Sequence, residues 1–557
     1  MTTISKLEYA AKLLNPDRAV RLDGGQLTLD SERFTHVAGN VTLAVDDPAL
    51  LDALDPRLSS RLQITATRDG GTPRVFDLGI REMSPDRQAG TVRLQLASDE
   101  AILQDFAQLV DDPAPRQREA SLRSVCNYVL GKIGTQLQPG TEDANVTAYW
   151  EIVNQLTNPR LANDAAAWQT GSGATAGNRV VMSAPLPPVG NTAYQWTAAP
   201  GDSNVVPLTS RYRVTPGKWY VFTAYLCSGV TRQARAAIQW WSAGGSVASS
   251  TAFGAFITSD VTAFRRLFVI AQCPPGVEQA VPYINTVGNA SGNLHYGTCG
   301  MFYEGNELVG YFDGATPDTT AYDYAWQAGA HASTSSRTPR VERSPEALIW
   351  RAGTSAMAFL EPLLKVAGLR IVCDERRRFT LRAGDYRAEG NQTYRQAVNI
   401  ATADESVSRD DDSWFDAAVY EYVWTDADGI EQRRVDAFAL PPSTGMPKVL
   451  RVELRDTPYP GPGRAEHIVR RAQGRGRTFT VSAVPPTLLE QTDQPLSIRL
   501  EGSPIQTGIA ASVEFNLDDD HVTVTSRTTD TPADAWILVP DEERWIDAPP
   551  NAPWNEE

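Results

Sequence analysis

Residues 218–229, with the sequence KWYVFTAYLCSG, decide the fold of the central part of this chain. They have the composition of an aromatic β-strand, and three stretches of the same kind follow at 234–245 (ARAAIQWWSAGG), 264–274 (FRRLFVIAQCP) and 293–305 (NLHYGTCGMFYEG). The sequence around them carries few charges and is rich in Trp, Gly, Ser and Thr. A series of aromatic strands of this kind predicts a β-sandwich of the jelly-roll type.

The sequence on either side of this central part has a different texture. Residues 20–100 contain short alternating strands, most clearly in TVRLQLAS, where Val92, Leu94 and Leu96 share one face. Strands at a spacing of roughly ten residues, separated by turns, indicate a sandwich or a barrel. The same style returns after residue 400. We therefore expect the jelly roll to be inserted into, or between the halves of, an outer structure.

Three segments change to a helical period. SLRSVCNYVLGKIG at 121–134 carries an apolar stripe and ends at a glycine. The segment 344–369 predicts a second helix that breaks near Gly353 and restarts at Ser355. The basic segment 463–477 predicts a third. The fold class expected is mainly β with a few helices, in which β-barrels are interrupted by the jelly roll.

These patterns divide the 557 residues into four parts. Residues 1–147 form an N-terminal β-barrel part with a helix, and 148–338 form the inserted jelly roll. Residues 339–535 form a C-terminal part with helices and a β-barrel. Residues 536–557 are Pro-rich and acidic without a folding pattern, so we expect a flexible tail.

Composition excludes several classes of function. The formal net charge of -16 disfavours binding to phosphate backbones, so no nucleic-acid binding is expected. No window is apolar enough to span a membrane, and the N-terminus lacks a secretory signal, so synthesis in a cytoplasm is expected. The five cysteines are dispersed without a C-x-x-C pair and are interpreted as buried thiols.

No catalytic constellation stands out. The chain lacks H-E-x-x-H, Walker and G-x-S-x-G motifs, and its five histidines are isolated in the sequence. His467 lies on the basic helix, where a solvated position is expected. A glycosidase pair such as Asp313 with Asp318 stays open as an alternative. We assign no catalytic residue and expect no enzyme activity.

Two acidic runs, Asp410–Asp412 and Asp518–Asp520, are candidates for calcium. Neither has the D-x-D-x-D-G spacing of an EF-hand. The second run lies between two alternating strands, where a hairpin turn explains it. No cofactor is therefore assigned from these residues.

The end of the central part carries the most specific signal. Residues 295–318, HYGTCGMFYEGNELVGYFDGATPD, and the aromatic, turn-rich continuation to residue 337 are similar to a recurring signature of minor tail proteins of phages that infect Actinobacteria. The central part as a whole resembles the carbohydrate-binding, galactose-binding-like jelly rolls inserted in those proteins. SLRSVCNYVLGKIG, GLRIVCDERRRFTLR and SVEFNLDDDHVTVTSRT, in the outer parts, resemble the baseplate hub family more weakly.

This resemblance implies a structural virion protein at the tail tip of a siphovirus. Its partners would be two further copies in a trimeric ring, the distal tail protein, the tape measure protein and glycans of the host cell wall. Jelly rolls of this type often carry a structural calcium ion, which would fall near Asn163 and Asp164. Two alternatives stay open: a tail-associated cell-wall hydrolase and a free carbohydrate-binding protein.

Sugar recognition needs aromatic faces on which pyranose rings stack. Trp240 and Trp241 are adjacent, so on a strand they point to opposite faces, one to the core and the other to a groove or surface. Tyr194 and Trp196 share a face and could line the same groove. These four residues are the candidate glycan-binding residues.

Overall fold

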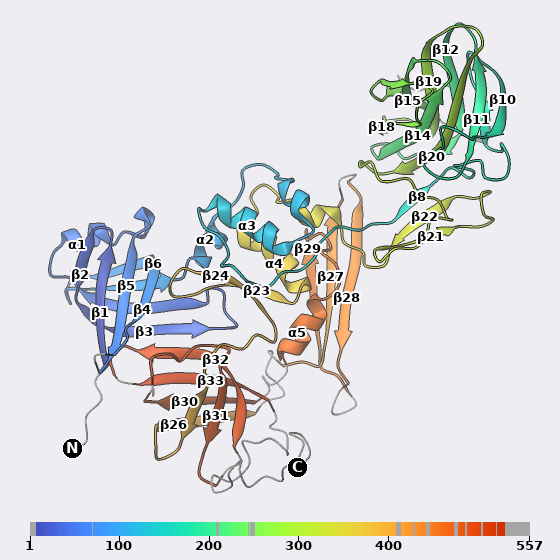
Figure 1. Ribbon diagram of the computed structural model, residues 1–557. Helices are drawn as coiled ribbons and strands as arrows, with labels where there is room; N and C mark the ends of the chain where they lie inside the picture. Colours follow the sequence, from blue (N-terminus) through green and yellow to red (C-terminus); the bar gives the residue numbers. More distant parts are fainter. Residues whose placement is uncertain are drawn as a thin grey trace. The chain divides into compact units, whose positions relative to one another are not determined.

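A computed structural model describes residues 7–69, 71–207, 211–242, 244, 251–407, 414–426, 429–441, 446–472, 477–484, 487–502, 505–519 and 521–529. The chain divides into two compact units (Figure 1). The first comprises Met1–Ala148, Pro345–Trp424 and Gln432–Glu557, and the second comprises Tyr149–Ser344 and Thr425–Glu431.

A 13-stranded sheet forms most of the first unit. Its main path runs through β2 (Asp17–Val20), β1 (Leu7–Leu14), β5 (Arg61–Arg68), β6 (Arg74–Asp86), β7 (Thr91–Ala97), β4 (Val37–Ala44), β3 (Leu22–Asp30), β32 (Gln506–Asn516), β33 (Val522–Thr529), β30 (Arg477–Ala483) and β26 (Ile400–Val407). β25 (Gln392–Arg395) pairs with β31 (Pro495–Arg499), which joins the sheet at β32.

The pairing of β3 with β32 joins residues from the two ends of the chain, for example Leu29 with Val513. The alternating residues expected to face a core do so, since Val92, Leu94 and Leu96 are all buried, in one apolar cluster that also contains Val513. The barrels expected from the strand spacing are not closed among the described residues. β3 pairs with β32 of the C-terminal part, so the N-terminal strands do not close on themselves.

All helices that the structure describes lie in the first unit. They are α1 (Ala49–Ala53), α2 (Glu100–Asp105), α3 (Leu122–Lys132), α4 (Ala356–Val366) and α5 (Arg464–Ala472), with 3-10 turns η1 (Pro56–Leu58), η2 (Ala114–Arg118) and η3 (Pro345–Leu348).

The predicted starts at residue 121 and at Ser355 are confirmed, whereas the helix predicted over 463–477 ends at Ala472 and Arg477 begins β30. Ser121 and Ser355 cap α3 and α4, because each hydroxyl accepts a hydrogen bond from the backbone N–H three residues later. Gly353, with a positive φ angle of 77°, lies at the predicted break, and Gly368, with a φ angle of 68°, directly follows the C-cap residue Ala367 of α4. Only the single turn η3 forms before the break.

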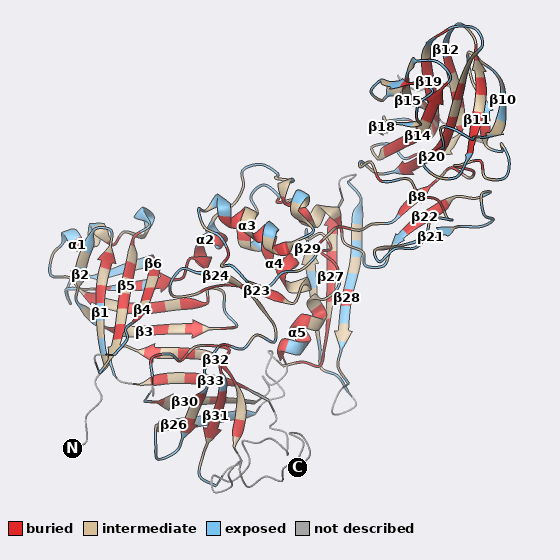
Figure 2. Cartoon of the chain, viewed as in Figure 1, coloured by how far each residue is buried: buried red, intermediate tan, exposed pale blue. Residues whose placement is uncertain are grey.

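Two smaller sheets lie mostly in the first unit, apart from Thr425 and Glu431 at the ends of two strands. One pairs β23 (Leu369–Cys373) with β24 (Phe379–Ala383), and the other has the order β28 (Glu431–Ala439), β27 (Ala417–Thr425), β29 (Val449–Arg455). Helix α5 packs Ala465 and Val469 against the aromatic residues of β27. Figure 2 shows β27 largely buried and β28 largely exposed.

The second unit contains two sheets whose inner faces share one core. The 5-stranded sheet has the order β10 (Ala174–Val181), β11 (Thr192–Ala198), β20 (Asn293–Glu304), β14 (Trp219–Ser228), β18 (Arg265–Gln272). The 7-stranded sheet has the order β16 (Ala252–Phe253), β15 (Arg232–Trp241), β19 (Gln279–Asn289), β12 (Gly201–Pro207), β9 (Trp168–Thr170), with β13 (Tyr212–Arg213) on β19 and β17 (Ile257–Ser259) on β15. All four predicted aromatic strands are present.

The closing stretch of the second unit returns the chain to its start. β21 (Tyr322–Trp326), β22 (Ser335–Pro339) and β8 (Ile152–Asn154) form a sheet in that order, with Arg337 opposite Ile152. Phe312 is buried against Met301 and Tyr303 of β20. The aromatic residues before β22 therefore cover part of the 5-stranded sheet, and the entry and exit strands of the unit lie side by side.

The five cysteines are all buried and free of disulfides. Within the described part of the chain, the helices are too short or too polar to cross a membrane. The expected acidic tail at 536–557 lies outside the described residues, as do Asp410–Asp412. Asp518 and Asp519 lie in the turn between β32 and β33, which confirms the hairpin expected there.

Candidate functional site

Three of the four aromatic residues predicted to bind glycans are core residues. Tyr194, Trp196 and Trp240 are 4%, 0% and 1% exposed and belong to the apolar cluster between the two sheets. Tyr194 and Trp196 do share a face, as expected, but it is the inner face. Because a sugar ring can stack only on an accessible aromatic face, the groove suggested for Tyr194 and Trp196 is not lined by these two side chains. Trp240 is the member of the tryptophan pair that lies in the core, as expected for one of the two.

Trp241 lies on the opposite side of β15 from Trp240 and is half-buried. The guanidinium group of Arg211 lies 3.6 Å from the centre of its ring. Arg235 covers the ring of Phe253 on the same sheet at 3.6 Å. The outer face of the 7-stranded sheet thus has aromatic rings, but its arginines already stack on them.

The outer face of the 5-stranded sheet has accessible aromatic residues whose rings are less closely covered by arginine side chains than those of the 7-stranded sheet. Strand register places Asn178 beside Gln195, and Gln195 beside Tyr296. The same register places Tyr225 beside Arg266. We call this surface the tyrosine face, and it consists of Asn178, Gln195, Tyr225, Arg266, Phe268 and Tyr296.

The side chains of the tyrosine face remain partly or fully accessible. Tyr225, Tyr296 and Gln195 are half-buried, Asn178 is exposed and Phe268 is 43% exposed. The two tyrosine hydroxyls and the two amide groups have no hydrogen-bond partner among the residues the structure describes. These groups are therefore available to a ligand rich in hydroxyls.

Arg266 is held in place by two hydrogen bonds within the protein. Its Nε donates to the hydroxyl of Thr223 at 3.0 Å, and its Nη2 donates to the carbonyl oxygen of Val309. Its guanidinium carbon lies 5.8 Å from the centre of the Tyr225 ring. Because two of its donors are fixed by the protein, the plane of the guanidinium group is set beside the ring before any ligand arrives.

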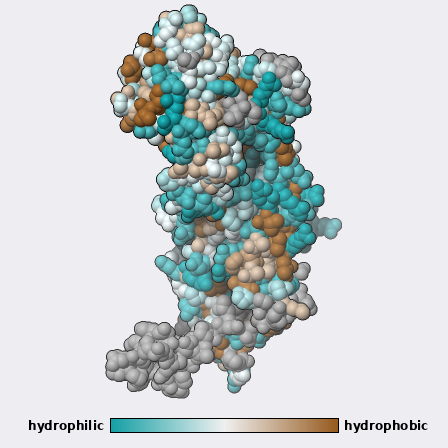
Figure 3. Space-filling model, turned by 90° about the vertical axis from the view of Figure 1, so that its right-hand side faces the viewer, coloured by the Kyte–Doolittle hydropathy of each residue, from teal (hydrophilic) through white to brown (hydrophobic). Residues whose placement is uncertain are grey.

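The exposed apolar residues are dispersed. Figure 3 shows one face of the molecule, on which hydrophobic residues form separate small patches among hydrophilic ones. In the second unit the large exposed apolar side chains include Phe253, Phe256 and Phe268. Small groups of aromatic residues with polar neighbours suit a carbohydrate better than they suit a large apolar protein partner.

A buried histidine lies on the inner side of β20. His295 is 0% exposed, its ring nitrogens lie 2.8 Å from the Ser228 hydroxyl and 2.9 Å from the Asn289 side-chain oxygen, and its ring packs against Trp196. Burial, with a smaller contribution from Arg232, lowers the pKa of His295 to about 4.

This histidine predicts a pH dependence of the second unit. Since an unfolded histidine titrates near 6.5, the unfolded chain binds a proton between pH 6.5 and about 4 that the folded chain does not. Above pH 6.5 this histidine does not reduce the free energy of unfolding of the second unit. As the pH falls towards 4, the free energy of unfolding decreases by roughly 3 kcal/mol. Hydrogen exchange of the backbone amides of β14 and β20, followed as a function of pH, measures this loss of stability. In His295→Gln we expect a weaker dependence, and an unchanged slope contradicts the assignment.

Both carboxylates considered for glycoside hydrolysis form contacts within the protein. Asp313 is 1% exposed, forms an ion pair with Arg160 at 3.1 Å and accepts a hydrogen bond from the hydroxyl of Tyr311. Asp318 accepts a hydrogen bond from the backbone N–H of Tyr324. Both carboxylates therefore stabilise the closing stretch.

The calcium site suggested by the resemblance would lie near Asn163 and Asp164. The side chain of Asp164 accepts hydrogen bonds from Asn158 and from the backbone of Ala166, both at 2.9 Å. Across the described residues, no cluster of three or more His, Cys, Asp or Glu side chains could hold a metal ion.

Comparison with known proteins finds many solved structures with weak similarity, and three of them are described here. No protein-family model and no curated protein matches the sequence. The 43 kDa tail protein of prophage MuSo2 from Shewanella oneidensis is 9% identical, with 94% of this chain and 98% of that chain covered and a TM-score of 0.40. The enzymatically active domain of tailspike protein 4 from bacteriophage CBA120 is 14% identical, with a TM-score of 0.23, and the match covers 27% of this chain and 21% of that one.

The third structure is a family 16 carbohydrate-binding module. It is 12% identical, with 27% of this chain and 99% of that chain covered and a TM-score of 0.21. The similar structures therefore include phage tail proteins and a carbohydrate-binding module. Identities and TM-scores this low establish neither a shared fold nor a shared function.

The sequence contained a signal for the tyrosine face that composition alone did not reveal. In β14, Tyr220 and Phe222 point inward, so Tyr225 must point outward because its position has the opposite parity. The outward positions Val221 and Thr223 are themselves buried, however. Both faces of the strand therefore look apolar in the sequence, and alternation alone does not decide which one is accessible.

Proposed function

We propose that the chain is a structural protein of a phage tail, and that its second unit binds carbohydrate on the host cell surface. The observation that carries the binding half is the tyrosine face, where two tyrosines stand beside amide and guanidinium groups. Pyranose rings stack on such aromatic faces, and their hydroxyls pair with amide and guanidinium groups. The tail half rests on the resemblance of residues 295–337 to minor tail proteins.

The edges of the 13-stranded sheet support assembly with further copies. No additional strand pairs with the outer edge of β2 or β26 in the part of the chain that the structure describes. Most side chains of β26 are exposed, and Val407 at its end is 71% exposed. An open edge of this kind pairs readily with another chain. We infer a trimeric ring at the tail tip of a siphovirus, in contact with the distal tail and tape measure proteins.

We expect Tyr225→Ala and Tyr296→Ala each to weaken binding to host cell-wall polysaccharide about tenfold or more. A stacking aromatic residue at the centre of a binding surface contributes on the order of 1–3 kcal/mol. Both tyrosines are half-buried at the sheet surface, so the variants should keep their fold. Isothermal titration of the full-length chain with fragments of purified polysaccharide measures the affinity, and a melting curve measures the fold.

Tyr283→Ala is the matched control, since Tyr283 is also half-buried but lies on the outer face of the 7-stranded sheet. Its affinity should equal that of the wild type. If Tyr283→Ala and Trp241→Ala lose binding while the tyrosine-face variants keep it, the glycan site is on the other sheet. Absence of any binding by the wild-type chain would remove carbohydrate recognition from the proposal.

A further inference from the structure

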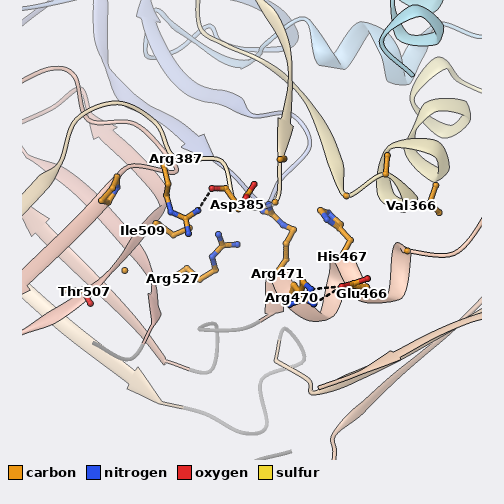
Figure 4. Close-up of a pocket in the computed structure, with 17 residues that line it drawn as sticks. Val366, Asp385, Arg387, Glu466, His467, Arg470, Arg471, Thr507, Ile509 and Arg527 are labelled. Atoms are coloured by element: carbon orange, nitrogen blue, oxygen red, sulfur yellow. Dashed lines mark hydrogen bonds and ion pairs between the residues drawn. The ribbon is translucent and has the colours of Figure 1, made fainter. Parts of the chain in front are cut away.

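A pocket of about 770 Å³ lies in the first unit between α5, the end of α4 and strands β32 and β33 (Figure 4). Four arginines line it: Arg387, Arg470, Arg471 and Arg527. We call it the arginine pocket. Apolar groups such as Val366 and Ile509 form part of its wall, and the only carboxylates among its described lining residues are Asp385 and Glu466.

The arginines of the pocket are not balanced by its carboxylates. Arg470 pairs with Glu466 at 2.8 Å along α5. Arg471 and Arg527 share one carboxylate, because both donate to Oε1 of Glu32, at 2.5 and 3.2 Å.

Arg387 adds a further positive charge at the pocket. It donates to the backbone carbonyl oxygens of Asp385 and Tyr386. In Figure 4 the guanidinium groups of Arg387, Arg471 and Arg527 point toward one another from three segments. Within a chain of net charge -16, this is a local excess of positive charge.

The buried side chains of the pocket are affected by this excess of positive charge. Arg471 is 8% exposed, and its Nη1 atom is buried without a hydrogen-bond partner among the described residues. Burial and the charge of Arg370 lower its pKa to about 10. A buried guanidinium N–H without a hydrogen-bond acceptor lowers the stability of the fold, unless a bound ligand accepts its hydrogen bond.

His467 was expected to be solvated and is instead buried, at 6% exposure. Burial, together with smaller contributions from the charges of Lys365, Arg471, Arg370 and Arg464, lowers its pKa to about 3. The histidine is therefore neutral, and its surroundings are positively charged.

We propose that the arginine pocket binds an acidic polypeptide segment. Its volume is much larger than a single phosphate or sulfate ion requires and falls in the range of sites that hold extended ligands. Its wall combines guanidinium groups, which bind carboxylates in a planar fork, with apolar side chains that a peptide can contact.

The chain itself contains a segment of this chemistry. Residues 530–557 carry eight Asp and Glu residues and a single Arg, together with three tryptophans. They follow directly on β33, whose Arg527 lines the pocket. We therefore take residues 530–557, from the same copy or from a neighbouring one, as the segment that binds.

Arginine labelling of the full-length chain tests the proposal. Arg387 and Arg470 are exposed at the pocket, so phenylglyoxal can modify them, and mass spectrometry measures each rate. In a variant with Asp541, Glu542, Glu543 and Asp547 changed to Asn or Gln, both arginines should be modified at least about fivefold faster. Arg376, which is exposed elsewhere in the first unit, is the control and should keep its rate.

A synthetic peptide of residues 530–557, added to that variant, should restore the protection of both arginines from phenylglyoxal. Addition of about 0.5 M NaCl should weaken this protection, because salt screens the attraction between the charges. Rates that rise on dilution of the wild type would assign the segment to a neighbouring copy. Equal rates in wild type and variant, without protection by the peptide, would overturn the proposal. Protection by inorganic phosphate alone would also overturn it, in favour of a small anion.

Discussion

Replacing Trp196 by alanine is expected to destabilise the second unit by roughly 3–5 kcal/mol, the usual cost of removing a fully buried tryptophan. Trp196 is 0% exposed, and its Nε1 atom donates a hydrogen bond to the hydroxyl of Ser203 at 3.0 Å. The substitution leaves a cavity beside His295, whose ring centre lies 5.2 Å from that of the tryptophan. It also leaves the Ser203 hydroxyl without its donor.

Calorimetry of the full-length chain measures this effect as a lower melting temperature for one transition. For a unit of this size the shift should be on the order of 10 °C. Trp241→Ala is the control, because Trp241 is half-buried on the outer face of the sheet, and a loss of about 1–2 kcal/mol is expected for it. Equal losses in the two variants would show that Trp196 is not the core residue described above.

The second large effect is expected for Asp493→Asn in the first unit. Asp493 is 1% exposed, and its carboxylate pairs with Arg370 of β23 and with Arg382 of β24, the latter at 3.4 Å. Removing its charge leaves two nearly buried guanidinium groups uncompensated, which costs roughly 3–5 kcal/mol. Asparagine tolerates the positive φ of 64° at this position, so the loss reports the charge and not the backbone.

Denaturant unfolding of the first unit measures the loss. Asp105→Asn is the matched control, because Asp105 pairs with Arg81 in the same unit but both side chains are well exposed. Its effect should stay below about 1 kcal/mol. If Asp493→Asn is as mild as this control, the two arginines have another source of compensation, and the positive character of the neighbouring arginine pocket would need to be reconsidered.

The parts of the fold that depend on local sequence were predictable. Ser121, Ser355 and Gly368 mark helix ends because capping and positive φ angles are properties of single residues and their near neighbours. The alternating strands around Leu94 likewise identify their own buried face. The prediction that one of Trp240 and Trp241 lies in the core follows from the same alternation of side chains along a strand.

The remaining features depend on contacts between distant segments. Nothing local indicates that Leu29 pairs with Val513, so closed barrels were expected where an open sheet forms. The arginine pocket combines Arg387, Arg471 and Arg527 from three separate segments, and the basic helix alone suggested a solvated face. Tyr194 and Trp196 were placed on one face correctly, but the choice of inner or outer face depends on the second sheet of the sandwich.

A cryo-EM map of purified phage particles that encode this chain tests the proposed function most directly. We predict three copies in a ring at the tail tip, with the 13-stranded sheet in the ring and the tyrosine face of the second unit accessible from outside. Mass spectrometry of the same particles should detect the chain. Its absence from the particles, or a map in which the tyrosine face is covered by other tail proteins, would contradict the proposal.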